Sequence, residues 1–113
     1  PSAPTSRRKI RAKQPGTTGI IVHNEAVRLA MVAVLKEHAC DVPTQMSVVA
    51  ICPDDMAATD AVAFTNIAIP AHEVGTIAVD MVLRHLDATA PTETRLLSPV
   101  MTVRDSTAAP RAR

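Results

Sequence analysis

Two clusters of polar side chains directly follow apolar segments rich in β-branched residues. Amides and carboxylates in such places offer hydrogen-bond donors and acceptors to a polar ligand. Since ligands of open α/β sheets bind beyond the carboxyl ends of strands, both clusters are candidate ligand contacts. The first cluster follows residues 18–22 and the second follows residues 46–51; their members are His23, Asn24 and Glu25, and Cys52, Asp54 and Asp55.

The other polar residues do not predict a catalytic, metal or cofactor site. The four histidines are scattered along the chain, and the adjacent Asp54 and Asp55 would point apart as neighbours in a strand or helix. Cys40 and Cys52 form no CxxC pair, which argues against a zinc or redox centre. No glycine-rich phosphate loop is present. We therefore expect no enzyme activity, no metal and no cofactor.

Each candidate ligand contact also has a structural interpretation. Asn24 precedes a helical pattern and is a good N-cap, which is compatible with a ligand contact through the same side chain. Asp54 and Asp55 follow Pro53 at a turn, where they can cap a short helix. The sequence alone leaves capping and ligand binding open at these positions.

The hydrophobic pattern predicts an α/β fold with at least one parallel crossover. Short β-branched runs suit strands that are covered on both faces of a parallel sheet. The pattern predicts strands at 18–22, 46–52, 65–69 and 95–103, helices at 25–38 and 71–87, and a short helical piece at 57–60.

The helix expected at 25–38 has two apolar faces. Leu29 and Ala33 lie off its main apolar stripe, so this helix needs a second partner, within the fold or across a subunit interface. The main stripe consists of Val27, Met31, Val34 and Leu35, against the polar Arg28, Lys36 and Glu37. The helix expected at 71–87 has one face made of Val74, Ile77, Ala78, Met81 and Val82.

Composition excludes some classes of partner. The 113 residues include one Phe and no Tyr or Trp, so the core is aliphatic and base-stacking platforms for single-stranded nucleic acid are excluded. Residues 14–110 hold five basic and eleven acidic residues, a net charge of −6, whereas residues 1–13 hold five basic residues and no acid. The basic end can be an arm for nucleic acid or a membrane surface, or a solvated terminus. No signal peptide or membrane span is predicted, which favours a cytoplasmic protein.

Three segments resemble the C-terminal part of lac repressor-type (LacI/GalR) transcription regulators. Ile20–Glu25 (IIVHNE) resembles the family's strand that ends in Asn-Asp/Glu before a helix. Asp41–Ile51 (DVPTQMSVVAI) resembles its VP-x-D-[IV]-S-V-V-G-F signature. Leu97–Pro110 (LSPVMTVRDSTAAP) resembles its closing segment, in which R-x-S-T-A is the most specific part.

The resemblance implies part of a parallel-sheet, three-layer lobe of the periplasmic-binding-protein-like (type I) fold. We expect a basic tail or linker at 1–17, the segment of the C-terminal lobe at 18–105, and a C-terminal tail at 106–113 that frays from Arg104 onward. The family's helix-turn-helix and N-terminal lobe have no counterpart in this sequence, so we expect a fragment. Operator DNA would be read only through that missing helix-turn-helix.

The resemblance also implies roles for individual residues. Asn24 matches an Asn that hydrogen-bonds ligand hydroxyls in the family. Cys52 departs from the family, which usually has Asp there, and Asp54 or Asp55 can substitute from a shifted position. A C-terminal-lobe homodimer is implied at Leu29, Ala33, Met56 and Asp60, with burial within one subunit as the alternative.

We therefore expect an effector-binding and dimerisation segment of such a regulator. The effector is a small molecule, a sugar or a related metabolite. The alternatives are a stand-alone ligand-binding or dimerisation module that forms mixed dimers with a full-length relative, a truncated non-functional remnant, and a solute-binding protein of a transporter.

Overall fold

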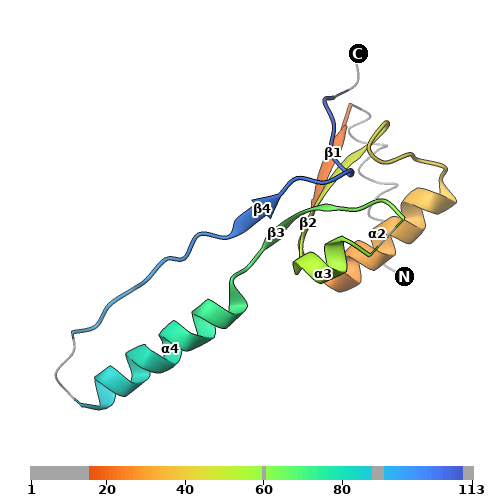
Figure 1. The fold of residues 1–113 in the computed structure, drawn as a ribbon. Helices are drawn as coiled ribbons and strands as arrows, with labels where there is room; N and C mark the ends of the chain where they lie inside the picture. Colours follow the sequence, from red (N-terminus) through yellow and green to blue (C-terminus); the bar gives the residue numbers. More distant parts are fainter. Residues whose placement is uncertain (1–15, 60, 88–90, 111–113) are drawn as a thin grey trace.

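The computed structural model describes residues 16–59, 61–87 and 91–110. It contains a four-stranded sheet in the order β1-β2-β3-β4 (Figure 1). β1 and β2 are parallel, β2 and β3 are parallel, and β3 and β4 are antiparallel. The strands are β1 (Gly19–Val22), β2 (Ser47–Ile51), β3 (Thr65–Ala68) and β4 (Val100–Thr102). The expected α/β class with a mainly parallel sheet is confirmed.

Three helices connect these strands. α2 (Glu25–Glu37) forms the crossover from β1 to β2, α3 (Asp54–Ala57) is a single turn after β2, and α4 (Ala71–Leu86) follows β3. The short helix begins three residues earlier than the predicted piece at 57–60, because Pro53 is its N-cap and Asp54 and Asp55 stand in its first turn. A basic tail or linker was predicted at 1–17. Residues 1–15 of this segment lie outside the part of the chain that the structure describes.

One face of the sheet packs on α2 and α3 and forms the core. Val22, Val48 and Ala50 are buried there beside Leu35 of α2, Ala57 of α3 and Phe64. Cys40 and Cys52 are both buried as free thiols, as expected. The opposite face is more open, since Ile21 is 69% exposed.

The apolar stripe of α2 is rotated from the predicted one. Val34 and Leu35 are buried as expected, but Val27 is exposed and Arg28, which the pattern assigned to the polar face, is buried. Glu25 and the ring of Phe64 both contact the Arg28 guanidinium, which allows a cation to occupy a core-facing position.

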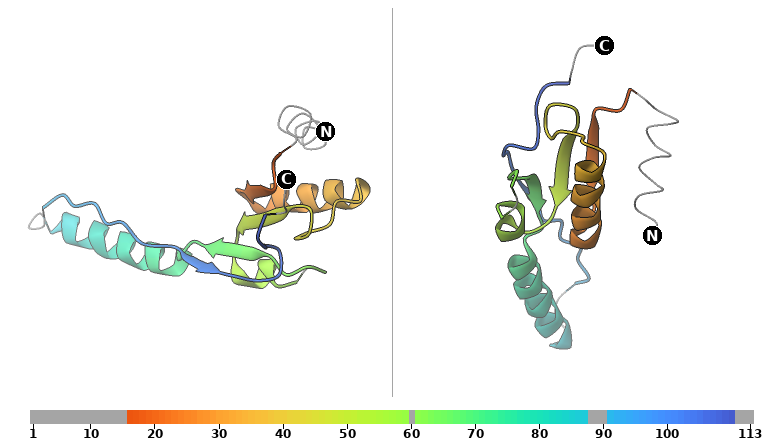
Figure 2. Two further views of the ribbon diagram at one scale, coloured as in Figure 1. Left: turned by 90° about the horizontal axis from the view of Figure 1, so that it is seen from above. Right: turned by 90° about the vertical axis from the view of Figure 1, so that its right-hand side faces the viewer.

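α4 forms as predicted, but no residue in it is buried. Helix α4 and the chain leading into β4 run outward from the rest of the molecule (Figures 1 and 2). The molecule as a whole is therefore elongated, with extents of 58 × 26 × 25 Å. Of the predicted apolar face, Ile77 and Met81 are half-buried, and the rest is exposed. The strand predicted at 95–103 is limited to three residues, because β4 pairs only with Asn66, Ile67 and Ala68 of β3.

The C-terminal end of α2 has a Schellman cap around Ala39. Cys40 N–H donates to Leu35 O over 2.9 Å and Ala39 N–H donates to Lys36 O over 3.2 Å. This geometry places Ala39 in the left-handed region, at φ 48°. Glycine adopts that conformation without the steric cost that a Cβ adds.

We therefore expect Ala39→Gly to raise the free energy of unfolding by about 0.5–1 kcal/mol. The matched control is Ala58→Gly, because Ala58 has an ordinary right-handed backbone conformation and should lose stability on the same change. Urea unfolding followed by far-ultraviolet circular dichroism measures both. A loss of stability in Ala39→Gly would contradict the prediction.

Candidate ligand-binding rim

The two predicted polar clusters lie at the same edge of the sheet. β1 and β2 are parallel neighbours, so the residues after Val22 and those after Ile51 leave the sheet at one end. The charges of Arg28 and Glu25, and those of Arg104 and Asp54, all act on the Cys52 thiol, so these groups lie near the same cysteine. We call this edge, formed by residues 23–25 and 52–55, the rim.

Asn24 is the N-cap of α2. Its backbone is extended (φ −145°, ψ 170°), and its side-chain Oδ1 accepts a hydrogen bond from Val27 N–H over 2.9 Å. The capping interpretation is therefore confirmed. In the described part of the chain, the Nδ2 group of Asn24 donates to no protein group, and the side chain is exposed. Capping thus leaves the amide NH2 group of Asn24 available as a donor at the rim.

Glu25 is held by Arg28, one turn further along α2. Nε of Arg28 donates to Glu25 Oε2 over 2.9 Å, and its terminal nitrogen makes a further ion pair with Oε1. These hydrogen bonds lower the pKa of Glu25. The guanidinium also lies 5.5 Å from the centre of the Phe64 ring. Arg28 is a site residue that the sequence pattern did not predict, although its i,i+3 spacing from Glu25 signals the pair.

Cys52 is buried, and burial raises the pKa of its thiol. A neutral thiol is a weak donor and a weak acceptor, so it cannot make the charge-assisted bonds of a carboxylate at this position.

Asp54 is fixed by residues distant in the sequence. Its Oδ1 accepts hydrogen bonds from Asn66 Nδ2 over 3.1 Å and from the terminal NH2 of Arg104 over 3.2 Å. Both hydrogen bonds lower the pKa of Asp54, and the one from Asn66 has the larger effect. α3 has no side-chain cap, so the capping interpretation of Asp54 and Asp55 is wrong. Oδ2 of Asp54 accepts no hydrogen bond from the described residues, and 62% of the side chain is exposed.

Asn66 and Arg104 complete the support of the rim. Asn66 is fully buried and also donates to Cys52 O over 2.9 Å. Arg104 donates to Asn66 Oδ1 and to Phe64 O, the latter over 3.1 Å. Neither residue was predicted as a site residue. In the sequence, Asn66 stands out as an amide within an apolar strand, and Arg104 as the arginine of the closing R-x-S-T segment. Neither feature shows which residue the side chain contacts.

The closing segment is attached to β2 and β3. Ser106 is fully buried; its hydroxyl donates to Val48 O and accepts from Thr65 N–H over 2.7 Å. Val48 N–H donates to Ser106 O over 2.9 Å. The pairing of β2 with β3 begins at Val49 and Thr65, so Val48 has no partner in β3. Ser106 binds Val48 in the place of such a partner. Fraying from Arg104 onward was expected, but Arg104 and Ser106 are held by these bonds.

The remaining predicted residues are at the surface. His23 and Asp55 are exposed at the rim. Leu29 is 54% and Met56 40% exposed, and Ala33 is also exposed, so none of the three is buried within this subunit. Asp60 lies outside the described residues.

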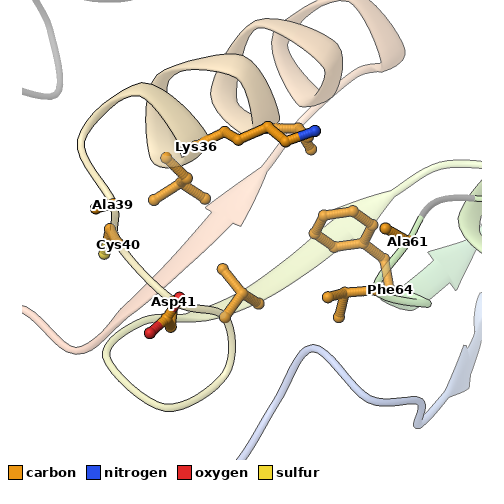
Figure 3. Close-up of a pocket in the computed structure, with 10 residues that line it drawn as sticks. Lys36, Ala39, Cys40, Asp41, Ala61 and Phe64 are labelled. Atoms are coloured by element: carbon orange, nitrogen blue, oxygen red, sulfur yellow. The ribbon is translucent and has the colours of Figure 1, made fainter.

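A separate pocket lies at the other end of α2. It has a volume of about 400 Å³ and contains no predicted rim residue (Figure 3). Lys36, Asp41 and Phe64 lie around it with mostly apolar neighbours. In the described ranges, no group of three or more His, Cys, Asp or Glu side chains could hold a metal ion. None of the helices described is both long and apolar enough to cross a membrane.

Known proteins share this fold. The sequence profile of the periplasmic binding protein-like domain matches residues 2–107. A LacI family transcriptional regulator from Bifidobacterium animalis subsp. lactis is 22% identical, with a TM-score of 0.85 over 98% of this chain and 41% of that chain. No curated protein sequence matches.

Two further similar structures contain sugars. A LacI family regulator from Enterococcus faecium with bound ribose is 22% identical, with a TM-score of 0.76 over 96% of this chain and 42% of that chain. A LacI family regulator from Arthrobacter sp. FB24 in complex with lactose is 19% identical, with a TM-score of 0.76 over 94% of this chain and 41% of that chain. The chain spans about two fifths of the regulators it resembles. It belongs to the periplasmic binding protein-like domain family, and its fold is that of part of the effector domain of LacI/PurR-type transcription regulators.

Proposed function

We propose that this chain is the effector-binding and dimerisation segment of a LacI-type transcription regulator, and that its rim binds a sugar-like small molecule. The observation that carries the proposal is the rim itself. Asn24 presents a free amide donor and Asp54 presents a free carboxylate oxygen, from neighbouring strand ends of a family fold whose similar structures contain ribose and lactose. Vicinal hydroxyls need such a donor and acceptor pair.

The described rim supports binding rather than catalysis. Two of its carboxylates, Glu25 and Asp54, are held by Arg28, Asn66 and Arg104. Its thiol is buried, and burial raises the pKa. In the regulator, the effector would change the affinity for operator DNA through a coupling free energy between two sites. The DNA would be contacted by a helix-turn-helix of the regulator.

Exposed apolar surface favours a segment of a larger domain over a stand-alone module. Val79, Val82 and Leu83 of α4 are about 60% exposed, and Leu86 is 75% exposed. Contiguous surface of this kind marks an interface. The N-terminal lobe of a two-lobed effector domain would cover it.

The test of the rim separates capping from ligand binding at Asn24. Serine is as good an N-cap as asparagine but has no amide, so we expect Asn24→Ser to change the free energy of unfolding by less than about 0.5 kcal/mol. We expect its affinity for the sugar that binds the wild-type chain to fall about tenfold, since a donor to the ligand is lost.

A panel of neutral monosaccharides and disaccharides, including ribose and lactose, identifies that sugar by proton–nitrogen correlation NMR. Thr59→Ser, which also alters one surface polar side chain, is the control and should bind normally. Unchanged affinity in Asn24→Ser would contradict the assignment of Asn24 as a ligand contact.

We propose that the homodimer forms through the second apolar face of α2 together with α3. The exposed Leu29 and Ala33 lie one turn apart on α2, and the exposed Met56 belongs to α3. A two-fold axis would make this patch contact itself. Asp60, outside the described residues, belongs to the same proposed surface.

We expect Leu29→Asp to convert the dimer to a monomer, because two like charges would meet across the symmetric interface. Sedimentation velocity at several concentrations measures the change. Leu96→Asp, at a position that is 94% exposed and remote from α2, should leave the dimer intact. A wild-type chain that sediments as a monomer at all concentrations would refute this interface.

A further inference from the structure

The charges at the rim are arranged by depth. The carboxylates are outermost: the side chain of Asp54 is 62% exposed, that of Glu25 is 30% exposed, and Asp55 is exposed. The cations lie beneath them, because the side chain of Arg28 is 4% exposed and that of Arg104 is 18% exposed. A ligand that approaches the rim therefore meets negative charge first.

The hydrogen bonds of the two arginines keep them directed inward. Nε and a terminal nitrogen of Arg28 bind Glu25, and its guanidinium lies against Phe64. Arg104 donates through one terminal nitrogen to Phe64 O and Asn66, and through the other to Asp54. An anionic ligand could bind these two cations only by displacing the carboxylate or carbonyl that each of them already binds.

The N-terminus of α2 does not offset the negative charge that the exposed carboxylates place at the rim. A helix N-terminus favours anions through its free N–H groups and its dipole. Here the side chain of Asn24 occupies Val27 N–H, and Glu25 already places a negative charge in the first turn. The positive end of the helix is therefore neutralised by the chain itself.

We propose that the rim selects against anions: its effector presents hydroxyl groups to Asp54 and carries no phosphate or carboxylate on the side that faces this lobe. The inference rests on the proposed function and specifies its ligand as an uncharged polyhydroxyl compound. Phosphorylated sugars are excluded by the exposed carboxylates, and Asp54 is the residue that contributes most to the exclusion, because it is the more exposed of the two carboxylates that the network holds in place.

The experiment compares matched pairs of probes on the complete 113-residue chain. Ribose and ribose 5-phosphate, glucose and glucose 6-phosphate, and galactose and galactose 6-phosphate are titrated at one pH and one ionic strength. Proton–nitrogen correlation NMR follows the amides of residues 23–25 and 52–55. We expect at least one neutral sugar to shift these amides, and its phosphate to bind at least tenfold more weakly.

Charge variants identify the source of the discrimination. Asp54→Asn should reduce the ratio between a sugar and its phosphate to less than threefold. Glu37→Gln removes one negative charge at the far end of α2 and should leave the ratio unchanged. Asp54→Asn is informative only if its spectrum is dispersed, as that of a folded chain is. If it is not, Asp55→Asn replaces it, because Asp55 is exposed and has no role in the network. Asp55→Asn should reduce the ratio in part.

The outcomes distinguish this inference from the proposed function. A phosphate that binds the rim as tightly as its parent sugar, or more tightly, would overturn the inference and leave the sugar-binding function standing. Absence of any shift at the rim with every probe would reject both. An equal ratio in Asp54→Asn and in the wild-type chain would show that the exposed carboxylate is not the cause.

Discussion

Phe64→Ala is expected to lower the free energy of unfolding by about 3–5 kcal/mol. Phe64 is the only aromatic residue of the chain and is 3% exposed in the core. Its removal leaves a cavity that the surrounding aliphatic side chains fill only in part. It also removes the ring that covers the guanidinium of Arg28.

Urea unfolding followed by far-ultraviolet circular dichroism measures the loss, since the chain has no tryptophan for fluorescence. Leu96→Ala is the control, because Leu96 is 94% exposed and its truncation should change stability by less than about 0.5 kcal/mol. A loss below about 1 kcal/mol in Phe64→Ala would show that Phe64 is not part of a packed core in solution.

Ser106→Ala is the second large expected effect, a loss of about 2–6 kcal/mol. The Ser106 hydroxyl satisfies two buried backbone groups at once, Val48 O and Thr65 N–H. Alanine has no hydroxyl and leaves both groups without a partner in a place that water does not reach, at about 1–3 kcal/mol each. Because these groups belong to β2 and β3, the loss should also loosen the contact between the two strands.

The control for Ser106→Ala is Ser98→Ala, the same chemical change at an exposed position. It should alter stability by less than about 0.5 kcal/mol. Hydrogen exchange at Thr65 N–H provides a local readout, and we expect this amide to exchange faster in Ser106→Ala. Slow exchange with unchanged stability would mean that residues 104–108 do not contact the sheet in solution.

The elements of the fold were largely predictable because their signals are local. Thr18–Val22 and Met46–Cys52 are β-branched runs, and a helix directly after Asn24 follows from its capping preference. The strand expected at 95–103 was mostly wrong because strand formation depends on a neighbour. β3 offers only three residues to β4 before the chain turns into α4.

The rim was predictable only where its residues are neighbours in the sequence. Asn24 and Asp54 follow strands directly, so topology alone brings them together at one edge. Asn66 and Arg104 reach the same place from positions 12 and 50 residues away from Asp54, and no pattern of periodicity or spacing encodes those contacts. Arg28 illustrates a related limit: helical periodicity assigned it to the solvent face, whereas its pairing with Glu25 and Phe64 buries it.

The most direct test of the central claim is a map of the amide shifts that a bound sugar produces in this chain. Proton–nitrogen correlation NMR with the neutral sugar panel provides it in one series of spectra. We predict that the largest shifts occur at residues 23–25 and 52–55, with smaller ones at Asn66 and Arg104, which hold Asp54. Shifts confined to the pocket at the other end of α2, around Lys36, Asp41 and Phe64, would contradict the account, as would a panel that shifts no amide.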